Sequence, residues 1–265
     1  MIRVSHVKKT FRVSKREAGF MNACRSFVHK QYEEIPALDD ISFHIKEGEM
    51  VGYIGVNGAG KSSTIKVLSG ILTPDSGSVL CNGLTPWKQR KAYVKDIGVV
   101  FGQRSQLWWD LPVIDSFNLL KDIYGVTDQN FLNNLNEISE TLQLQELLKT
   151  PLRQLSLGQK MRCELAAALL HQPKILFLDE PTIGLDALSK IAIRNFLKQM
   201  NEKYHTTMIL TTHDAADIEA LCNRVLLIGK GKILMDGSFS DIKKQVGKEN
   251  SLDEMFASFY RRFDL

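Results

Sequence analysis

The stretch "GVNGAGKSS", residues 55–63, places three glycines in front of one lysine and two serines. The apolar run before it, at 50–54, predicts a strand buried on both faces, and helical spacing of apolar residues at 65–72 predicts a helix after it. Strand, glycine loop and helix form the context in which G-x-x-x-x-G-K-[ST] cradles phosphates. Glycines let backbone N–H groups turn inward, and a helix N-terminus adds about half a positive charge. The stretch therefore predicts a nucleoside triphosphate site.

The side chains of this loop suggest roles at the phosphates. Lys61 is expected to reach the β- and γ-phosphates, Ser62 to ligate Mg²⁺, and Ser63 to hold the α-phosphate. The other loop residues expected to contact the nucleotide are Gly55, Asn57, Gly58, Ala59 and Gly60. We therefore predict a nucleoside triphosphate and Mg²⁺ as the bound ligands. The alternative, a glycine-rich turn with an exposed lysine, does not account for the flanking strand and helix.

A second segment, "PKILFLDEPT" at 173–182, supplies two acids after an apolar run that predicts another buried strand. Asp179 falls at the carboxyl end of that strand, where parallel sheets place ligands, and is expected to hold Mg²⁺ through water. Glu180 follows directly and is placed to polarise an attacking water. An ordinary strand end is the alternative for the two acids alone. Together with the phosphate loop, they predict hydrolysis.

The bulk composition sets broad limits. The chain has 265 residues with 44% hydrophobic content, enough for a large core. A net charge of +4 is small for this length and argues against nucleic acid as a partner. We see no apolar run of about 18 residues and no secretory signal, so a cytosolic location is expected.

Three further motifs complete a pattern: "LSLGQ" at 155–159, "GLD" at 184–186 and "TTHD" at 211–214. With the two segments above, they strongly resemble, in order, the ATPase subunits of ABC transporters. The resemblance implies an α/β fold of the P-loop NTPase type, with a RecA-like core, an antiparallel β flap and a helical signature subdomain. It implies one ATPase domain over 1–265. Its parts would be a core at about 1–101 and 171–235, a helical subdomain at about 104–170, and a tail at 236–265.

The resemblance also implies roles for single residues. Ser156, Gly158 and Gln159 would belong to the signature motif, which faces ATP bound on a second subunit in a head-to-tail dimer. The remaining roles implied are Gln103 at Mg²⁺ and the attacking water, His213 at the γ-phosphate, Asp186 at the dimer seam and Phe11 on adenine. Two positions depart from the usual pattern: Leu157 replaces a glycine, and Ile183 stands where serine is common.

Secondary structure in the rest of the chain follows periodicity and turn residues. Leucine and isoleucine at helical spacing predict helices within 113–126 and 131–148. "LTPDSGSVLCNG", residues 72–83, predicts a short strand between two turns, and "NRVLLIGKGKILMDG", residues 223–237, predicts a hairpin.

Two stretches of the sequence indicate what process the hydrolysis would drive. Trp108 and Trp109 are either core residues or, as the resemblance implies, anchors in a groove for a membrane subunit. An insertion at 14–40 carries a helical apolar stripe from Phe20 to Tyr32 with basic residues elsewhere. Such a helix would pack on its own domain or touch the membrane surface through residues 14–35. The insertion is similar to that of polysaccharide and teichoic acid export ATPases.

The resulting hypothesis is the ATPase subunit of a bacterial ABC-2 type exporter. It would act as a homo- or heterodimer beneath integral membrane permease subunits, peripheral to the cytoplasmic face of the cell membrane. The alternative is a soluble ABC ATPase of a non-transport assembly complex, like those serving iron–sulfur clusters. That alternative would share every catalytic motif.

Overall fold

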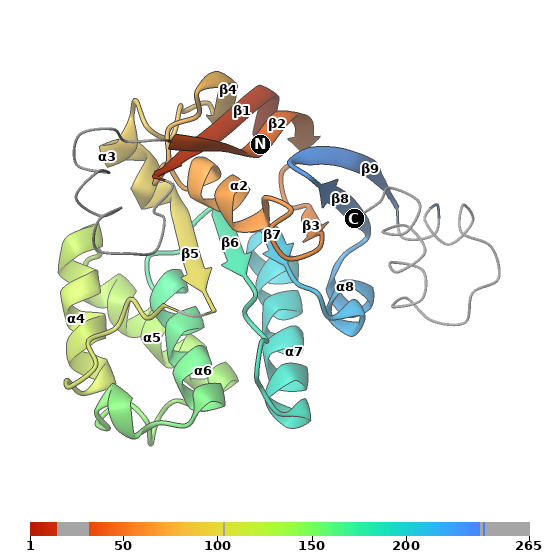
Figure 1. Ribbon diagram of the computed structural model, residues 1–265. Helices are drawn as coiled ribbons and strands as arrows, with labels where there is room; N and C mark the ends of the chain where they lie inside the picture. The colour runs from red at the N-terminus through yellow and green to blue at the C-terminus, as the bar shows by residue number, and fades with distance from the viewer. Residues whose placement is uncertain (15–31, 103, 239–240, 242–265) are drawn as a thin grey trace, which may run out of the picture.

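The computed structural model describes residues 1–14, 32–102, 104–238 and 241, in two sheets and several helices (Figure 1). The strands are β1 (Ile2–Ser14), β2 (Tyr32–Ile45), β3 (Met50–Ile54), β4 (Ser76–Cys81), β5 (Ile97–Phe101), β6 (Ile175–Asp179), β7 (Thr207–Thr211), β8 (Arg224–Gly229) and β9 (Lys232–Ser238). The helices are α2 (Lys61–Leu68), α3 (Arg90–Tyr93), α4 (Val113–Tyr124), α5 (Asp128–Leu142), α6 (Leu157–Leu169), α7 (Ala187–Tyr204) and α8 (Ala215–Leu221). The prediction of an α/β fold is confirmed.

The larger sheet has six strands in the order β5-β6-β7-β3-β8-β9. All neighbours pair in parallel except β8 and β9, which form an antiparallel hairpin as predicted. Every residue of β3 and β7 is buried, in keeping with the apolar run that predicted a strand at 50–54. Because β3, β6 and β7 are adjacent and parallel, the segments after Ile54, Asp179 and Thr211 emerge at one edge of the sheet.

The smaller sheet is antiparallel, in the order β2-β1-β4, and lies above α2 in Figure 1. Its strand β4 confirms the short strand predicted within 72–83. Residues 15–31 of the insertion lie outside the described residues. Tyr32, which was assigned to a helical stripe, instead belongs to β2 and pairs with Ser14 of β1. That assignment was wrong because the β1–β2 ladder continues to Tyr32 and fixes its backbone as a strand.

Helices α4, α5 and α6 gather at the lower left of Figure 1, beside β5 and α7. Their buried faces share one hydrophobic cluster that includes Phe117, Phe131, Ile138 and Leu165. The helix predicted within 131–148 ends earlier, at Leu142, because Gln143 adopts a left-handed conformation with φ of 52° and caps it. No helix in the described part of the chain is long and apolar enough to cross a membrane.

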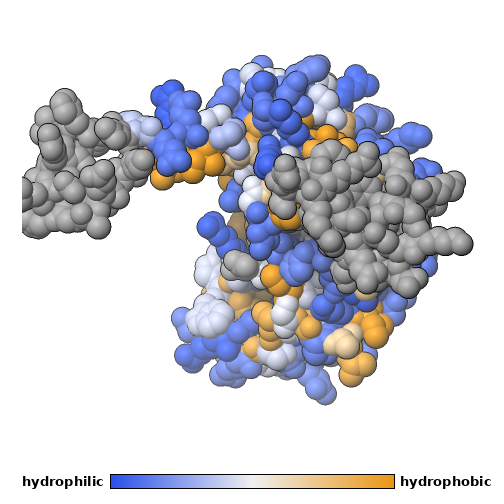
Figure 2. Space-filling view, turned by 45° about the vertical axis from the view of Figure 1, so that its right-hand side comes forward, coloured by the Kyte–Doolittle hydropathy of each residue, from blue (hydrophilic) through white to orange (hydrophobic). Residues whose placement is uncertain are grey.

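Figure 2 shows that the surface is mainly hydrophilic, with separate apolar patches. The exposed large apolar side chains include two neighbours, Trp108 and Trp109. Of the two interpretations of this pair, burial in the core is therefore wrong: Trp109 keeps 55% of its surface exposed.

Candidate nucleotide site

The loop between β3 and α2 has a backbone that only glycine fits at several positions. Gly60, at the N-cap of α2, has φ of 112°, and a Cβ there would lie 2.5 Å from the carbonyl oxygen of Ala37. A Cβ on Gly55 would lie 2.3 Å from the carbonyl oxygen of Ile228. Gly58 also has a positive φ, of 82°, but open space around it. The glycines are therefore required by close backbone approach and by backbone conformation.

Lys61 begins α2 and turns back over the loop. Its Nζ donates hydrogen bonds to the carbonyl oxygens of Gly55, at 2.7 Å, and Val56, at 3.2 Å. Only 6% of the residue is exposed. Burial lowers the pKa of Lys61, and the Glu180 and Asp179 carboxylates oppose that shift. The lysine is thus a fixed cation inside a loop of backbone amides, which suits phosphate binding.

Asp179 ends strand β6 and Glu180 follows it, as the sequence predicts, and both residues form hydrogen bonds with Thr211 of β7. The hydroxyl of Thr211 donates to Asp179 at 2.6 Å, and the N–H of Glu180 donates to the carbonyl oxygen of Thr211 at 3.0 Å. Glu180 has φ of 55°, a left-handed conformation that is costly for a residue with a side chain. The turn also brings the N–H of Gly102 to the carbonyl oxygen of Asp179, at 2.8 Å.

His213 lies across from Glu180, with its Nδ1 3.6 Å from a carboxylate oxygen of that glutamate. The loop carrying His213 is anchored by Asp217, which is fully buried in α8. Asp217 accepts hydrogen bonds from the hydroxyls of Thr182 and Thr212 and from Nε of Arg194. Because Thr182 follows the acid pair and Thr212 precedes His213, one carboxylate fixes both segments together.

Asp179, Glu180 and His213 line a cavity of about 490 Å³, together with Asn57 and Ser62 from the loop region. Its lining residues are Asn57, Ser62, Lys66, Ile71, Phe101, Gly102, Arg104, Asp179, Glu180, Ile183 and His213. A hydroxyl, a carboxylate and a phosphate loop in one cavity fit Mg²⁺, which takes few protein ligands and completes its shell with phosphates and water. Mg²⁺ held by Ser62 and Asp179 would supply charge neutralisation at those phosphates.

The start of α6 lies outside this cavity lining. Ser156 and Gln159 form a reciprocal capping box: the Ser156 N–H donates to Gln159 Oε1 at 2.8 Å, and the Gln159 N–H donates to Ser156 Oγ at 3.3 Å. Gly158 packs on the start of α7, since a Cβ there would lie 2.5 Å from Ser189 Oγ. Ser189 in turn donates to Asp186, and these hydrogen bonds hold the pKa of Asp186 below its usual range.

The cavity lining includes the predicted residues Asn57, Ser62, Asp179, Glu180 and His213. Phe11 is half-buried in β1, paired with Ile35, and is not part of the cavity lining. The prediction for Gln103 falls on a residue outside the described ones. Sequence reasoning missed Thr211 and Asp217, although both lie in or next to a quoted motif. A threonine at the end of a strand beside an acid-bearing strand was the available signal.

Fold and site together define a phosphate-loop nucleotide hydrolase. The protein-family model for the ABC transporter family matches residues 38–183, more than half of the chain. The chain therefore belongs to the ABC transporter ATP-binding family, and it is an ATP hydrolase that uses ATP with Mg²⁺.

Relatives within the family include proteins named for drug resistance, for multidrug transport and for import. The linearmycin resistance ATP-binding protein LnrL of Bacillus subtilis (strain 168) is 34% identical, over 83% of this chain and 70% of that protein. The methionine import ATP-binding protein MetN 2 of Enterococcus faecalis is 33% identical, over 92% of this chain and 67% of that protein. The probable multidrug ABC transporter ATP-binding protein YbhF of Escherichia coli (strain K12) is 33% identical, but this chain spans only 38% of its length.

A solved structure shares the fold closely. The dimeric post-hydrolysis state of the ATP-binding cassette MJ0796 bound to ADP and Pi has a TM-score of 0.75 and 26% identity, over 90% of this chain and 98% of that chain.

Proposed function

We propose that this chain is the ATP-hydrolysing subunit of a bacterial ABC-2 type exporter, peripheral to the cytoplasmic face of the cell membrane. Two relatives whose names refer to drug resistance or multidrug transport support export, while a relative named for methionine import shows that similarity alone does not fix direction. The observation that carries a membrane partner is the exposed pair Trp108 and Trp109, next to the segment that leads out of the nucleotide cavity.

The proposal includes a head-to-tail dimer. The capped start of α6, with Ser156, Gly158 and Gln159, lies outside the cavity that holds Glu180, so it is available to a site on a second subunit. Asp186 would lie at the seam, since it caps α7 directly beside Gly158. The solved structure of the MJ0796 cassette is dimeric, which supports this arrangement.

Each residue of the site has a proposed role. Lys61, Ser63 and the N–H groups of the loop bind the phosphates. Ser62, Asp179 and Gln103 contribute to the Mg²⁺ site. Glu180 accepts a proton from the attacking water, and His213 lies close enough to orient that carboxylate. The other proposed ATP contacts are Phe11, Gly55, Asn57, Gly58, Ala59 and Gly60. The proposed parts of the domain remain the core, the helical subdomain and the tail, with the bounds given above.

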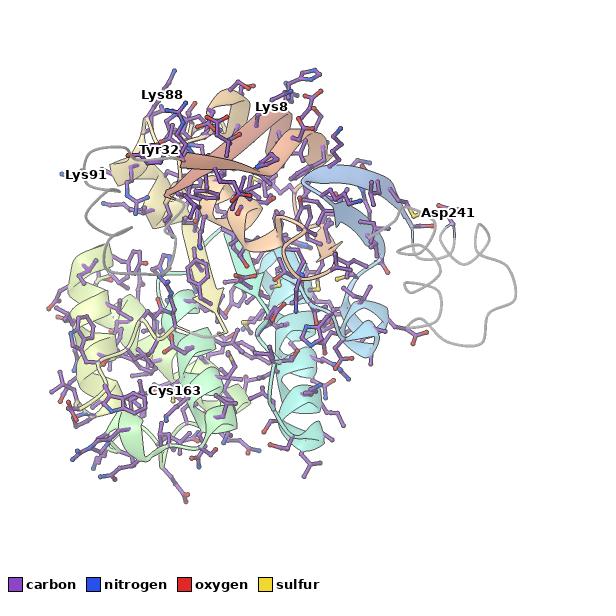
Figure 3. The ribbon with its side chains drawn as sticks, viewed as in Figure 1. Lys8, Tyr32, Lys88, Lys91, Cys163 and Asp241 are labelled. Carbon is purple, nitrogen blue, oxygen red and sulfur yellow. The ribbon has the colours of Figure 1, made fainter. Side chains whose placement is uncertain are left out.

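Contact of residues 14–35 with the membrane surface is also part of the proposal. Of this segment, residues 15–31 lie outside the described residues. At its end, Tyr32 and Ile35 are exposed apolar side chains of β2, and Figure 3 places Tyr32 on the same side of the view as Lys88 and Lys91. Exposed aromatic side chains and lysines on one side of a protein are suited to an anionic headgroup layer.

Affinity capture from native membranes in mild detergent tests the partner. We expect an integral membrane protein in stoichiometric amount, lost when Trp108 and Trp109 are both changed to alanine and kept in the control Trp87→Phe. Capture from the soluble fraction without a membrane protein would overturn the exporter and leave the assembly-complex alternative.

The variant Glu180→Gln tests the reaction. We expect turnover to fall by about 100-fold or more, while ATP-dependent dimers accumulate in size-exclusion chromatography. Normal turnover in this variant would remove Glu180 as the base, and persistently monomeric protein at saturating ATP would contradict the dimer.

A further inference from the structure

A buried carboxylate in the middle of α6, that of Glu164, forms hydrogen bonds with residues 105 and 106, which follow the nucleotide cavity in the chain. Glu164 is only 6% exposed and accepts hydrogen bonds from the hydroxyl of Ser105 and from the N–H of Gln106, at 3.2 Å. The Gln106 side chain donates back to the Glu164 carbonyl oxygen, at 3.1 Å. Cys163, the neighbour of Glu164, is labelled in Figure 3 among the lower helices.

A second residue of the same helix holds the next part of this segment. Lys160 lies four residues before Glu164, so both belong to one face of α6. Its Nζ lies 4.4 Å from the centroid of the Trp109 ring, a cation–π contact. The stretch 105–109 is therefore attached to α6 at both ends.

The choice of a carboxylic acid for this position needs a reason. Burying an ionisable group is costly unless hydrogen bonds compensate, and other buried positions of α6 near Glu164 are apolar, such as Leu165 and Ala168. Burial raises the pKa of Glu164, and the donors from Ser105 and Gln106 oppose that shift. All of its side-chain partners among the described residues come from one short stretch, so its contribution is to hold that stretch.

The attachment joins three places that the proposed function uses. Two turns before Glu164, α6 begins at the capped Ser156. The stretch 105–109 begins shortly after Gly102, whose N–H donates a hydrogen bond to the carbonyl oxygen of Asp179. It ends at the exposed Trp108 and Trp109. A shift of α6 relative to the large sheet must therefore carry the tryptophan surface with it.

We propose that Glu164, assisted by Lys160, is a positioning residue that makes movement of the signature helix and movement of the Trp108–Trp109 surface a single event. The coupling itself is a property of this chain. Its use in driving a membrane subunit rests on the proposed function.

Quenching of tryptophan fluorescence by acrylamide tests this directly. The chain has three tryptophans, so Trp87→Phe leaves Trp108 and Trp109 as the reporters. We expect a non-hydrolysable ATP analogue with Mg²⁺ to change the quenching constant. In Glu164→Gln the change should shrink by about threefold or more, while the affinity for the analogue stays within about twofold, because only the link between the sites is weakened.

The matched control is Glu140→Gln, which removes an exposed carboxylate of α5 and should leave the change intact. Ser105→Ala removes the hydroxyl that donates to Glu164, at an exposed residue, and replaces Glu164→Gln as the test variant if that protein does not fold. The effect of Ser105→Ala and that of Glu164→Gln should not add in the double variant, because both weaken the same contact between Glu164 and residues 105–106.

An undiminished change in Glu164→Gln, additive effects, or no nucleotide-dependent change in the parent protein would each overturn the proposal. Failure to capture a membrane subunit would refute the docking function alone, since the quenching experiment uses only this chain.

Discussion

The N-termini of helices α2 and α6 differ in how their backbone N–H groups are capped. At α2 the N-cap is Gly60, whose left-handed backbone offers no side chain to the first N–H groups. At α6 the N-cap is Ser156, and a capping box pairs the N–H groups of Ser156 and Gln159 with side-chain oxygens. The first terminus therefore leaves its N–H groups to a ligand, while the second is partly capped by its own side chains.

The difference teaches how the free chain can be well folded yet incomplete as an enzyme. The α2 terminus and Lys61 form the proposed phosphate site within one chain. At α6 the capping box keeps the first turn ordered in the free chain by pairing the N–H groups of Ser156 and Gln159. In the proposed dimer, this terminus would meet ATP held on a second subunit.

The largest expected effect follows from removing the cation at the open terminus. Lys61→Ala should weaken ATP binding by about 100-fold or more, since it deletes a charge-assisted contact to the phosphates and the two hydrogen bonds that shape the loop. Equilibrium binding of a fluorescent ATP analogue measures this. Lys91→Ala, an exposed lysine of α3, is the control, and equal affinities in the two variants would refute the phosphate site.

A pair of glycine substitutions separates close approach from backbone conformation in the same loop. Gly60→Ala should destabilise the fold by about 2–3 kcal/mol, because it adds a clash with the Ala37 carbonyl to the cost of a positive φ. Gly58→Ala should cost only about 1 kcal/mol, since its φ is positive but its surroundings are open. Urea denaturation compares them, and equal losses would show that the approach to Ala37 is not tight.

These two helix ends also show what sequence could predict. The phosphate loop, the acid pair and the strand before each of them were predicted from local spacing, because each motif joins neighbouring residues. Thr211, Asp217 and Glu164 were missed because each has a partner distant in the sequence, Asp179, Thr182 and Ser105 respectively, and only the tertiary fold pairs them. Tyr32 was misassigned because the helical spacing of apolar residues does not show that Tyr32 pairs with Ser14 in a β-ladder.

The capped terminus can be tested by separating its two roles. Ser156→Ala should cost about 1 kcal/mol of stability, while Ser156→Asp keeps a capping oxygen and should stay within about 0.5 kcal/mol of the parent. If α6 faces a γ-phosphate across a dimer, the added negative charge in Ser156→Asp should lower ATPase activity by about tenfold or more. Thermal denaturation and steady-state hydrolysis give the two readouts. Full activity in Ser156→Asp would mean that no phosphate approaches this end.

The smallest effect is expected at Leu157, where the family pattern has glycine. Leu157 is 48% exposed, and its Cδ2 lies 3.1 Å from where a Cβ on Gly184 would be, so its main neighbour is another exposed turn. Leu157→Gly should therefore change ATPase activity by less than about threefold and stability by about 1 kcal/mol at most, the usual penalty for glycine in a helix. Leu188→Gly is the matched control, an 80% exposed leucine in the first turn of α7. A loss well beyond that of the control would mean that the Leu157–Gly184 contact fixes the signature end against α7. The α6 terminus would then be held in place by packing as well as by its cap.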